Sequence, residues 1–110
     1  MLVTGGTKGI GFSCVKEVLD LNAAKVLICA RTEDSVKGAL EALNDARVQG
    51  CVCDVSSAKG RAKLVSAVKE HCGDSLDCLV NNVGTNKRKS IEDSTEEEYA
   101  TIMRTNVDSC

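Results

Sequence analysis

The sequence lacks an excess of charge of either sign, because 14 lysines and arginines nearly balance 16 aspartates and glutamates. Such a chain produces no long-range field that would attract nucleic acid or an anionic membrane. It also lacks long apolar runs, since runs such as residues 26–30 are far shorter than the ~20 residues that span a bilayer. We therefore expect neither nucleic-acid binding nor a membrane span.

The N-terminus lacks the charged stretch, apolar core and cleavage site of a secretory signal, because the chain enters residues 2–5, Leu-Val-Thr-Gly, directly after Met1. The absence of a signal favours a cytoplasmic protein, although import into an organelle stays open.

The cysteines lack the Cys-x-x-Cys spacing that is typical of structural zinc and of thioredoxin-like chemistry. They are odd in number and scattered: Cys14, Cys29, Cys51, Cys53, Cys72, Cys78 and Cys110. Free cysteine behaves as a small apolar residue, so we expect buried, reduced thiols and no metal site.

Short β-branched runs alternate with longer stretches of helical periodicity. Strands are predicted at 2–3, 25–30, 47–53 and 76–81, and helices at 9–21, 34–45, 57–72 and from about 94 onward. A polar loop is predicted at 84–93, and the last helix would begin with a capping box, Ser94 with Glu97 or Thr95 with Glu98. The residues predicted to face inward are Ile10, Cys14, Val18 and Leu19, then Val36, Ala39, Leu40 and Leu43, then Leu64, Val65, Val68 and Cys72.

This alternation predicts an α/β fold, because parallel neighbours need a crossover connection and a helix supplies it. The expected architecture is a doubly wound, Rossmann-type parallel sheet with helices on both faces and about four strands and four helices. Residues 1–110 would form a single, partial dinucleotide-binding domain.

A glycine-rich segment, residues 4–11, lies where the first strand turns into the first helix. Its glycines would allow a tight turn, a close approach to a pyrophosphate and close packing of helix on strand, with the anion at the helix N-terminus. The G-x-x-x-G-x-G spacing differs from a P-loop, and a plain glycine-rich turn is the alternative. The cofactor-binding candidates are Gly5, Thr7, Lys8, Gly9, Ile10 and Gly11.

The end of the second strand indicates the choice of cofactor. NAD-selective folds place a carboxylate here, which would repel a 2′-phosphate, but this chain has Ala30 followed by Arg31. Arg31 offers a planar fork of donors to a phosphate, and Lys8 adds a second positive charge. We therefore expect NADP(H) as cofactor, the alternative being that both cations are solvated surface charges.

With this loop, the sequence resembles the short-chain dehydrogenase/reductase family over its whole length. Four segments match in order: 4–11, 53–55, 81–84 and 105–107. Residues 82–86, followed by Arg88 and Lys89, further resemble the plant tropinone reductase-like branch.

The resemblance implies roles for six further residues. Asp54 would accept a hydrogen bond from the adenine amino group, with the Val55 backbone beside it, unless it only serves the helix entry near Ser56. Asn82 and Gly84 would line the adenosine ribose, whereas Asn81 would be structural and tie strand to helix. Asn106, the one catalytic candidate, would bend the last helix and hold a water of the proton relay, or be satisfied locally.

The family's Ser and Tyr-x-x-x-Lys, which bind the substrate carbonyl and deliver its proton, would follow Cys110. The one tyrosine, Tyr99, has Met103 four residues on, and His71 is expected to be a surface or helix-end histidine. We therefore expect an N-terminal piece of the family's domain. The family often pairs through its last helix here and the next one, which leaves a homo-oligomer open.

Two functions compete on these observations. The first is an NADP(H)-dependent oxidoreductase that reduces a small carbonyl compound or oxidises the alcohol. The second is a non-catalytic dinucleotide-binding sensor or partner module, and an inert gene remnant is a third interpretation.

Overall fold

The computed structural model describes residues 1–90 and 92–110 and confirms the predicted α/β class. Four parallel strands form one sheet in the order β3-β2-β1-β4. The strands are β1 (Leu2–Thr4), β2 (Val26–Ala30), β3 (Val48–Val52) and β4 (Leu79–Val80). The helices are α1 (Gly9–Asp20), α2 (Glu33–Leu43), α3 (Ala58–Cys72) and α4 (Glu96–Asn106).

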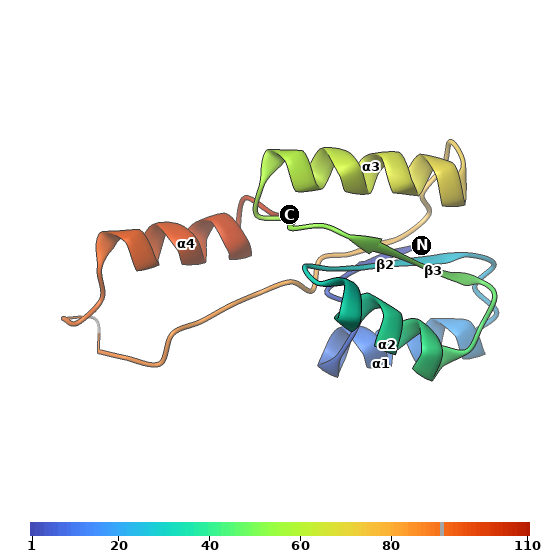
Figure 1. The fold of residues 1–110 in the computed structure, drawn as a ribbon, viewed down its shortest axis with the longest axis horizontal. Coiled ribbons are helices and arrows are strands. Elements are labelled where there is room, and N and C mark those ends of the chain that lie inside the picture. Colours follow the sequence, from blue (N-terminus) through green and yellow to red (C-terminus); the bar gives the residue numbers. More distant parts are fainter. Residues whose placement is uncertain (91) are drawn as a thin grey trace.

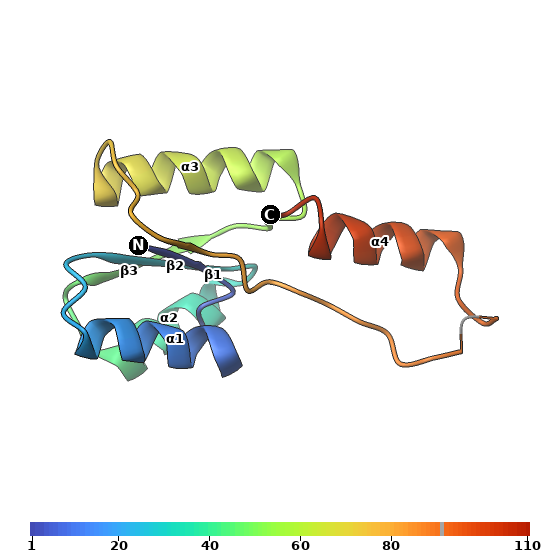
Figure 2. The same cartoon turned by 180° about the vertical axis from the view of Figure 1, so that it is seen from behind.

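The sheet is covered on both faces, by α1 and α2 on one side and by α3 on the other (Figure 1 and Figure 2). Successive side chains of a strand point to opposite faces, so Val26 and Ile28 pack under α1 and α2 while Leu27 and Cys29 pack under α3. The continuous apolar run of β2 follows from this arrangement, because neither of its faces meets water.

The strand order reverses beside β1, and this reversal positions the candidate site. The chain proceeds from β1 to β2 to β3 in one direction, whereas β4 pairs with the other side of β1. In open α/β sheets ligands bind outside the carboxyl ends of the strands at such a switch point. The loop after β1 and the segment after β4 therefore meet there, although they are far apart in sequence.

The prediction for the inner face of α1 was wrong at Ile10, which is 78% exposed. The helix instead buries Gly11, Val15 and Leu19. These residues are spaced by four, so they share one face, and Ile10 is turned about 100° away from Gly11 toward the loop side. For α2 the predicted inner face is confirmed, with Val36 and Ala39 buried.

One prediction for the inner face of α3 was also wrong. Val65 is 55% exposed rather than inward, because the stripe that faces the sheet runs through Gly60, Leu64 and His71. His71 lies near the helix end, as expected, but it is buried at 9% exposure, and its Nε2 has no hydrogen-bond partner within the described residues.

The cysteines only partly match the expectation of burial. Cys29, Cys51 and Cys53 are buried, Cys14 and Cys72 are half-buried, and Cys78 and Cys110 are exposed; all seven are free. Among residues 1–90 and 92–110, no group of three or more histidine, cysteine, aspartate or glutamate side chains is placed to hold a metal ion. No helix in the same residues is long and apolar enough to cross a membrane.

Strand β4 is shorter than the predicted 76–81, because it pairs only with the three-residue β1 and lies at the sheet edge. The loop predicted at 84–93 is irregular where described, and Ile91 lies outside the described residues. Of the two predicted capping boxes, the one between Thr95 and Glu98 forms. Helix α4 extends away from the sheet and has no buried residue (Figure 2).

Candidate functional site

The loop between β1 and α1 adopts backbone conformations that need glycine. Gly5 has a φ of 64° and Gly9 a φ of 55°, in the left-handed region that side chains disfavour. A Cβ on Gly9 would meet no atom within 4 Å, so the backbone there faces open space. The loop therefore exposes bare main chain where a ligand can approach closely.

The N-terminus of α1 carries no side-chain cap, since the N-cap residue is Lys8 and the first turn has no acidic residue. In contrast, Thr32, Ser57 and Thr95 cap α2, α3 and α4 with their side chains. An uncapped helix start leaves N–H groups and a positive dipole end without an acceptor from the protein. Both features suit an anionic ligand.

Two glycines of the loop are fixed by packing rather than by conformation. A Cβ on Gly11 would lie 2.5 Å from Asn82 Nδ2 and 2.6 Å from the Gly5 carbonyl oxygen. A Cβ on Gly6 would lie 2.8 Å from Ile28 Cγ2 of β2. The sequence predicted close packing by one glycine of this loop without indicating which one, and Gly6 was missed as a candidate because its contact with β2 has no signal along the chain.

Asn82 ties the loop to the segment after β4, whereas the sequence analysis expected Asn81 to be the structural asparagine and to tie strand to helix. Its side-chain amide donates to the carbonyl oxygens of Thr4 at 3.0 Å and Gly5 at 3.2 Å, and its backbone N–H donates to Thr4 Oγ1 at 3.0 Å. Thr4 Oγ1 in turn donates to the Val80 carbonyl oxygen at 3.3 Å. Asn81 is exposed, so the prediction for its side chain was wrong, and the buried Thr4 was missed.

The candidates that follow β2 and β3 lie close to each other at the carboxyl end of the sheet. Arg31 is exposed directly after β2, and Asp54 is exposed after β3. Hydrogen bonds from the Ser56 hydroxyl and backbone N–H lower the pKa of Asp54, and the positive charge of Arg31 lowers it further. Val55 is buried, and its carbonyl oxygen accepts a hydrogen bond of 2.8 Å from Arg61. The carboxyl end of the sheet thus carries a cation and a carboxylate near each other.

Asn106 connects α4 to the segment after β4. Its Oδ1 accepts from the Thr85 backbone N–H at 2.7 Å, and its Nδ2 donates to the Thr85 carbonyl oxygen at 2.9 Å. A Cβ on Gly84 would lie 3.7 Å from Asn106 Oδ1. The amide therefore fixes the path of Gly84 and Thr85 past the end of the sheet.

The remaining loop candidates surround the bare backbone. Thr7 is half-buried, whereas Lys8 and Ile10 are exposed. The structure thus brings the loop candidates together with Asn82 and Gly84 at one end of the sheet. Arg31 and Asp54 lie at the same carboxyl end of the sheet, after β2 and β3.

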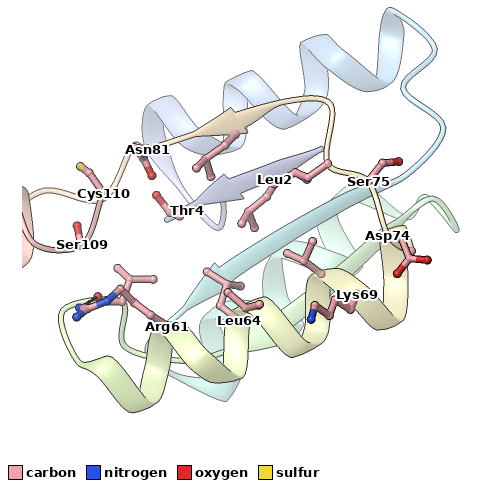
Figure 3. A pocket seen from close by; sticks show the side chains of 16 residues that line it. Leu2, Thr4, Arg61, Leu64, Lys69, Asp74, Ser75, Asn81, Ser109 and Cys110 are labelled. Carbon is pink, nitrogen blue, oxygen red and sulfur yellow. Dashed lines mark hydrogen bonds between the residues drawn. The ribbon is translucent and has the colours of Figure 1, made fainter.

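A separate hollow of about 390 Å³ lies between α3 and the β1–β4 edge (Figure 3). Leu2 and Leu64 face each other across it, Val65 and Leu79 also line it, and Cys110 lies at one end. Its lining is mainly apolar, which suits neither a pyrophosphate nor a ribose. This hollow accounts for the exposure of Val65 and is not the candidate cofactor site.

Comparisons with known proteins support the family that the sequence resembles. The family model for short chain dehydrogenases matches residues 1–110. A tropinone reductase homologue of Arabidopsis thaliana is 42% identical over 110 residues, which cover 98% of this chain and 41% of that protein. A tropinone reductase homologue of Datura stramonium is 39% identical, covering 96% of this chain and 40% of its own length.

Solved structures also resemble the chain. A short-chain dehydrogenase from Novosphingobium aromaticivorans superposes with a TM-score of 0.90 at 30% identity, covering 98% of this chain and 40% of that one. A 3-oxoacyl-reductase from Bacillus thuringiensis gives a TM-score of 0.85 at 28% identity, with 98% and 45% covered. The chain thus spans about two fifths of the length of the relatives it matches.

Proposed function

Because this chain belongs to the short-chain dehydrogenase family, we propose that residues 1–110 form a single, partial NADP(H)-binding domain of a carbonyl-reducing oxidoreductase. The family and the fold imply a nicotinamide dinucleotide cofactor. The observation that carries the proposal is the uncapped N-terminus of α1 beneath a bare glycine loop at the switch point of the sheet.

The loop fits the pyrophosphate in both shape and charge. Gly9 leaves room for close approach, and the first N–H groups of α1 supply donors. Thr7 and Ile10 flank this surface, and Gly5 and Gly11 keep the loop against Asn82. In this proposal the loop binds the pyrophosphate, and Asn82 keeps the loop in shape.

Arg31 and Lys8 support the choice of NADP(H) over NAD(H). Lys8 is an exposed cation within the loop, Arg31 is an exposed cation directly after β2, and no carboxylate occupies position 30. A guanidinium can bind a 2′-phosphate with two parallel hydrogen bonds. Asp54, one strand farther, would accept from the adenine amino group, with the Val55 backbone beside it.

The residues after β4 would complete the cofactor surface. Gly84 lets the chain pass close to the ribose, and Asn106 holds the adjacent Thr85 backbone at both its N–H and its carbonyl oxygen. When bound, the nicotinamide supplies hydride chemistry, while these residues bind and orient it. The substrate would be a small carbonyl compound or the corresponding alcohol, in line with the tropinone reductase homologues.

The cofactor choice is tested by titrating the chain with NADPH and NADH and following the reduced nicotinamide fluorescence. We expect saturation with NADPH, and we expect Arg31→Ala to weaken NADPH roughly tenfold or more, the effect of losing a hydrogen bond to a charged group, with NADH unchanged. Lys69→Ala, which removes an exposed cation near the far end of α3, serves as control. An unchanged NADPH to NADH affinity ratio in Arg31→Ala would rule out the assignment.

A second candidate is a dinucleotide-binding module without catalysis. For this candidate the dinucleotide-binding elements described above are sufficient; within the 110 residues Tyr99 is followed four residues later by Met103 and no Tyr-x-x-x-Lys occurs. Oxidation of NADPH in the presence of small ketones distinguishes the two when it is measured on the protein with any sequence by which its reading frame continues past Cys110. Saturable NADPH binding without turnover in that protein would favour the second candidate.

A further inference from the structure

The Asp54 carboxylate is held by one of its two oxygens. Oδ1 accepts a hydrogen bond of 3.0 Å from the Ser56 backbone N–H and one of 2.7 Å from the Ser56 hydroxyl. Within the part of the chain that the structure describes, Oδ2 accepts no hydrogen bond, and the side chain is exposed. One oxygen is therefore fixed to the protein and the other is free to meet a ligand.

The backbone beneath this carboxylate is already rigid. Arg61 donates to the Val55 carbonyl oxygen at 2.8 Å, and the Ser57 hydroxyl donates to the Asp54 carbonyl oxygen at 3.0 Å. The start of α3 packs so closely that a Cβ on Gly60 would collide with the Asp54 carbonyl oxygen. The freedom that remains is rotation of the Asp54 side chain, which the Ser56 hydroxyl restrains.

The same contacts keep Asp54 ionised. The Ser56 hydroxyl contributes most to the lowered pKa of Asp54, followed by the Ser56 backbone N–H, and the nearby charge of Arg31 acts in the same direction. An ionised carboxylate only accepts hydrogen bonds. It therefore favours a ligand that presents an N–H donor and opposes one that presents a carbonyl oxygen at the same place.

We propose that Ser56 is a positioning residue for base selectivity, whose hydroxyl holds Asp54 Oδ1 so that Oδ2 faces the exocyclic amino group of adenine. The inference deepens the proposed function, on which it rests, by assigning adenine selectivity to a pair of residues. Hypoxanthine carries a carbonyl oxygen where adenine carries the amino group. The hypoxanthine analogue of NADPH is therefore the discriminating probe.

The experiment measures the dissociation constants of the 110-residue chain for NADPH and for its hypoxanthine analogue. The ratio of the two constants defines the adenine preference. Ser56→Ala removes the hydroxyl and keeps the backbone N–H, and we expect the preference to fall about threefold or more, with the affinity for the hypoxanthine analogue unchanged. Ser56→Thr retains a hydroxyl and should retain the preference.

Two further variants separate the possible causes. Ser66→Ala removes a hydroxyl that donates to the Ala62 carbonyl oxygen within α3, and the preference should stay unchanged. Asp54→Asn should abolish most of the adenine preference. Two results would overturn the role of Ser56 without contradicting the adenine contact of Asp54. The first is equal weakening of both ligands by Ser56→Ala, and the second is an adenine preference that is unchanged in Ser56→Ala but lost in Asp54→Asn. An unchanged preference in Asp54→Asn removes the adenine contact itself.

Discussion

Gly11 lies where α1 packs against Asn82 of the segment after β4. A Cβ there would lie 2.5 Å from Asn82 Nδ2 and 2.6 Å from the Gly5 carbonyl oxygen, and both distances are too short for non-bonded atoms. Neither atom can move freely, because Asn82 Nδ2 already donates to two carbonyl oxygens of the loop. At this residue a single methyl group would displace the Asn82 amide that keeps the loop in shape.

Gly11→Ala is therefore expected to weaken NADPH binding at least tenfold and to lower the free energy of unfolding by roughly 1–3 kcal/mol, the range for overpacking a tight site. Gly38→Ala, in α2, is the control, because its Cβ would meet no atom within 4 Å. Helix propensity predicts that this control raises the stability by about 0.5–1 kcal/mol. Denaturant unfolding and NADPH titration measure both effects; a neutral Gly11→Ala would contradict the packing argument.

Helix α4 differs from the other helices in what stabilises it. It has no buried residue, whereas α2 buries Val36 and Ala39 against the sheet. Its start depends on the capping box between Thr95 and Glu98 and on ion pairs from Lys87 and Lys89 to Glu98, which hold the pKa of that carboxyl well below its usual range. Local contacts therefore matter more in α4 than packing.

Thr95→Ala and Thr32→Ala remove the same capping oxygen from an unpacked and a packed helix. Loss of such a cap costs about 1 kcal/mol. In Thr32→Ala we expect the loss in the global free energy of unfolding, because α2 folds with the core. In Thr95→Ala we expect it as weaker hydrogen-exchange protection of residues 96–106, with the global value unchanged. A global loss in both variants would show that α4 is coupled to the core.

At the scale of the whole molecule, Arg47 joins the ends of distant elements. Its guanidinium donates to the Leu19 carbonyl oxygen at 3.1 Å and to that of Ala23 at 3.3 Å, near the end of α1, and pairs with Asp45 Oδ2 at 2.6 Å. The hydrogen bond from the Arg47 side chain is the main cause that lowers the pKa of Asp45 from 3.8 to about 2. This ion pair couples the stability of the fold to pH.

Because the pKa of Asp45 is lower in the folded than in the unfolded state, its contribution to stability is present above pH 3.8 and is lost as the pH falls toward about 2. Asp45→Asn should therefore be less stable than the parent chain at about pH 5 to 7. The difference should shrink through that acidic window. Urea unfolding midpoints across pH test this, and a difference that stays constant from neutral to acidic pH would contradict the linkage.

Much of the architecture follows from local patterns. The apolar run of β2 and the three- and four-residue spacing of the α2 face predict their elements within about two residues, because both depend on neighbours along the chain. Element lengths at the sheet edge were less predictable, since β4 is limited by its short partner β1. The roles of Asn81 and Asn82 could not be separated either, because the two amides are adjacent in sequence and only one reaches the loop.

The sequence by itself determined the α/β class, the glycine loop and the cations beside it, because periodicity, glycine content and charge are properties of neighbouring residues. Only the tertiary structure decided that Gly6 must stay small against Ile28 and that Thr4 and Asn82 hold the loop. The contact between Thr4 and Asn82 joins residues 78 positions apart. Such contacts depend on which strands become neighbours, and no pattern along the chain encodes that distance.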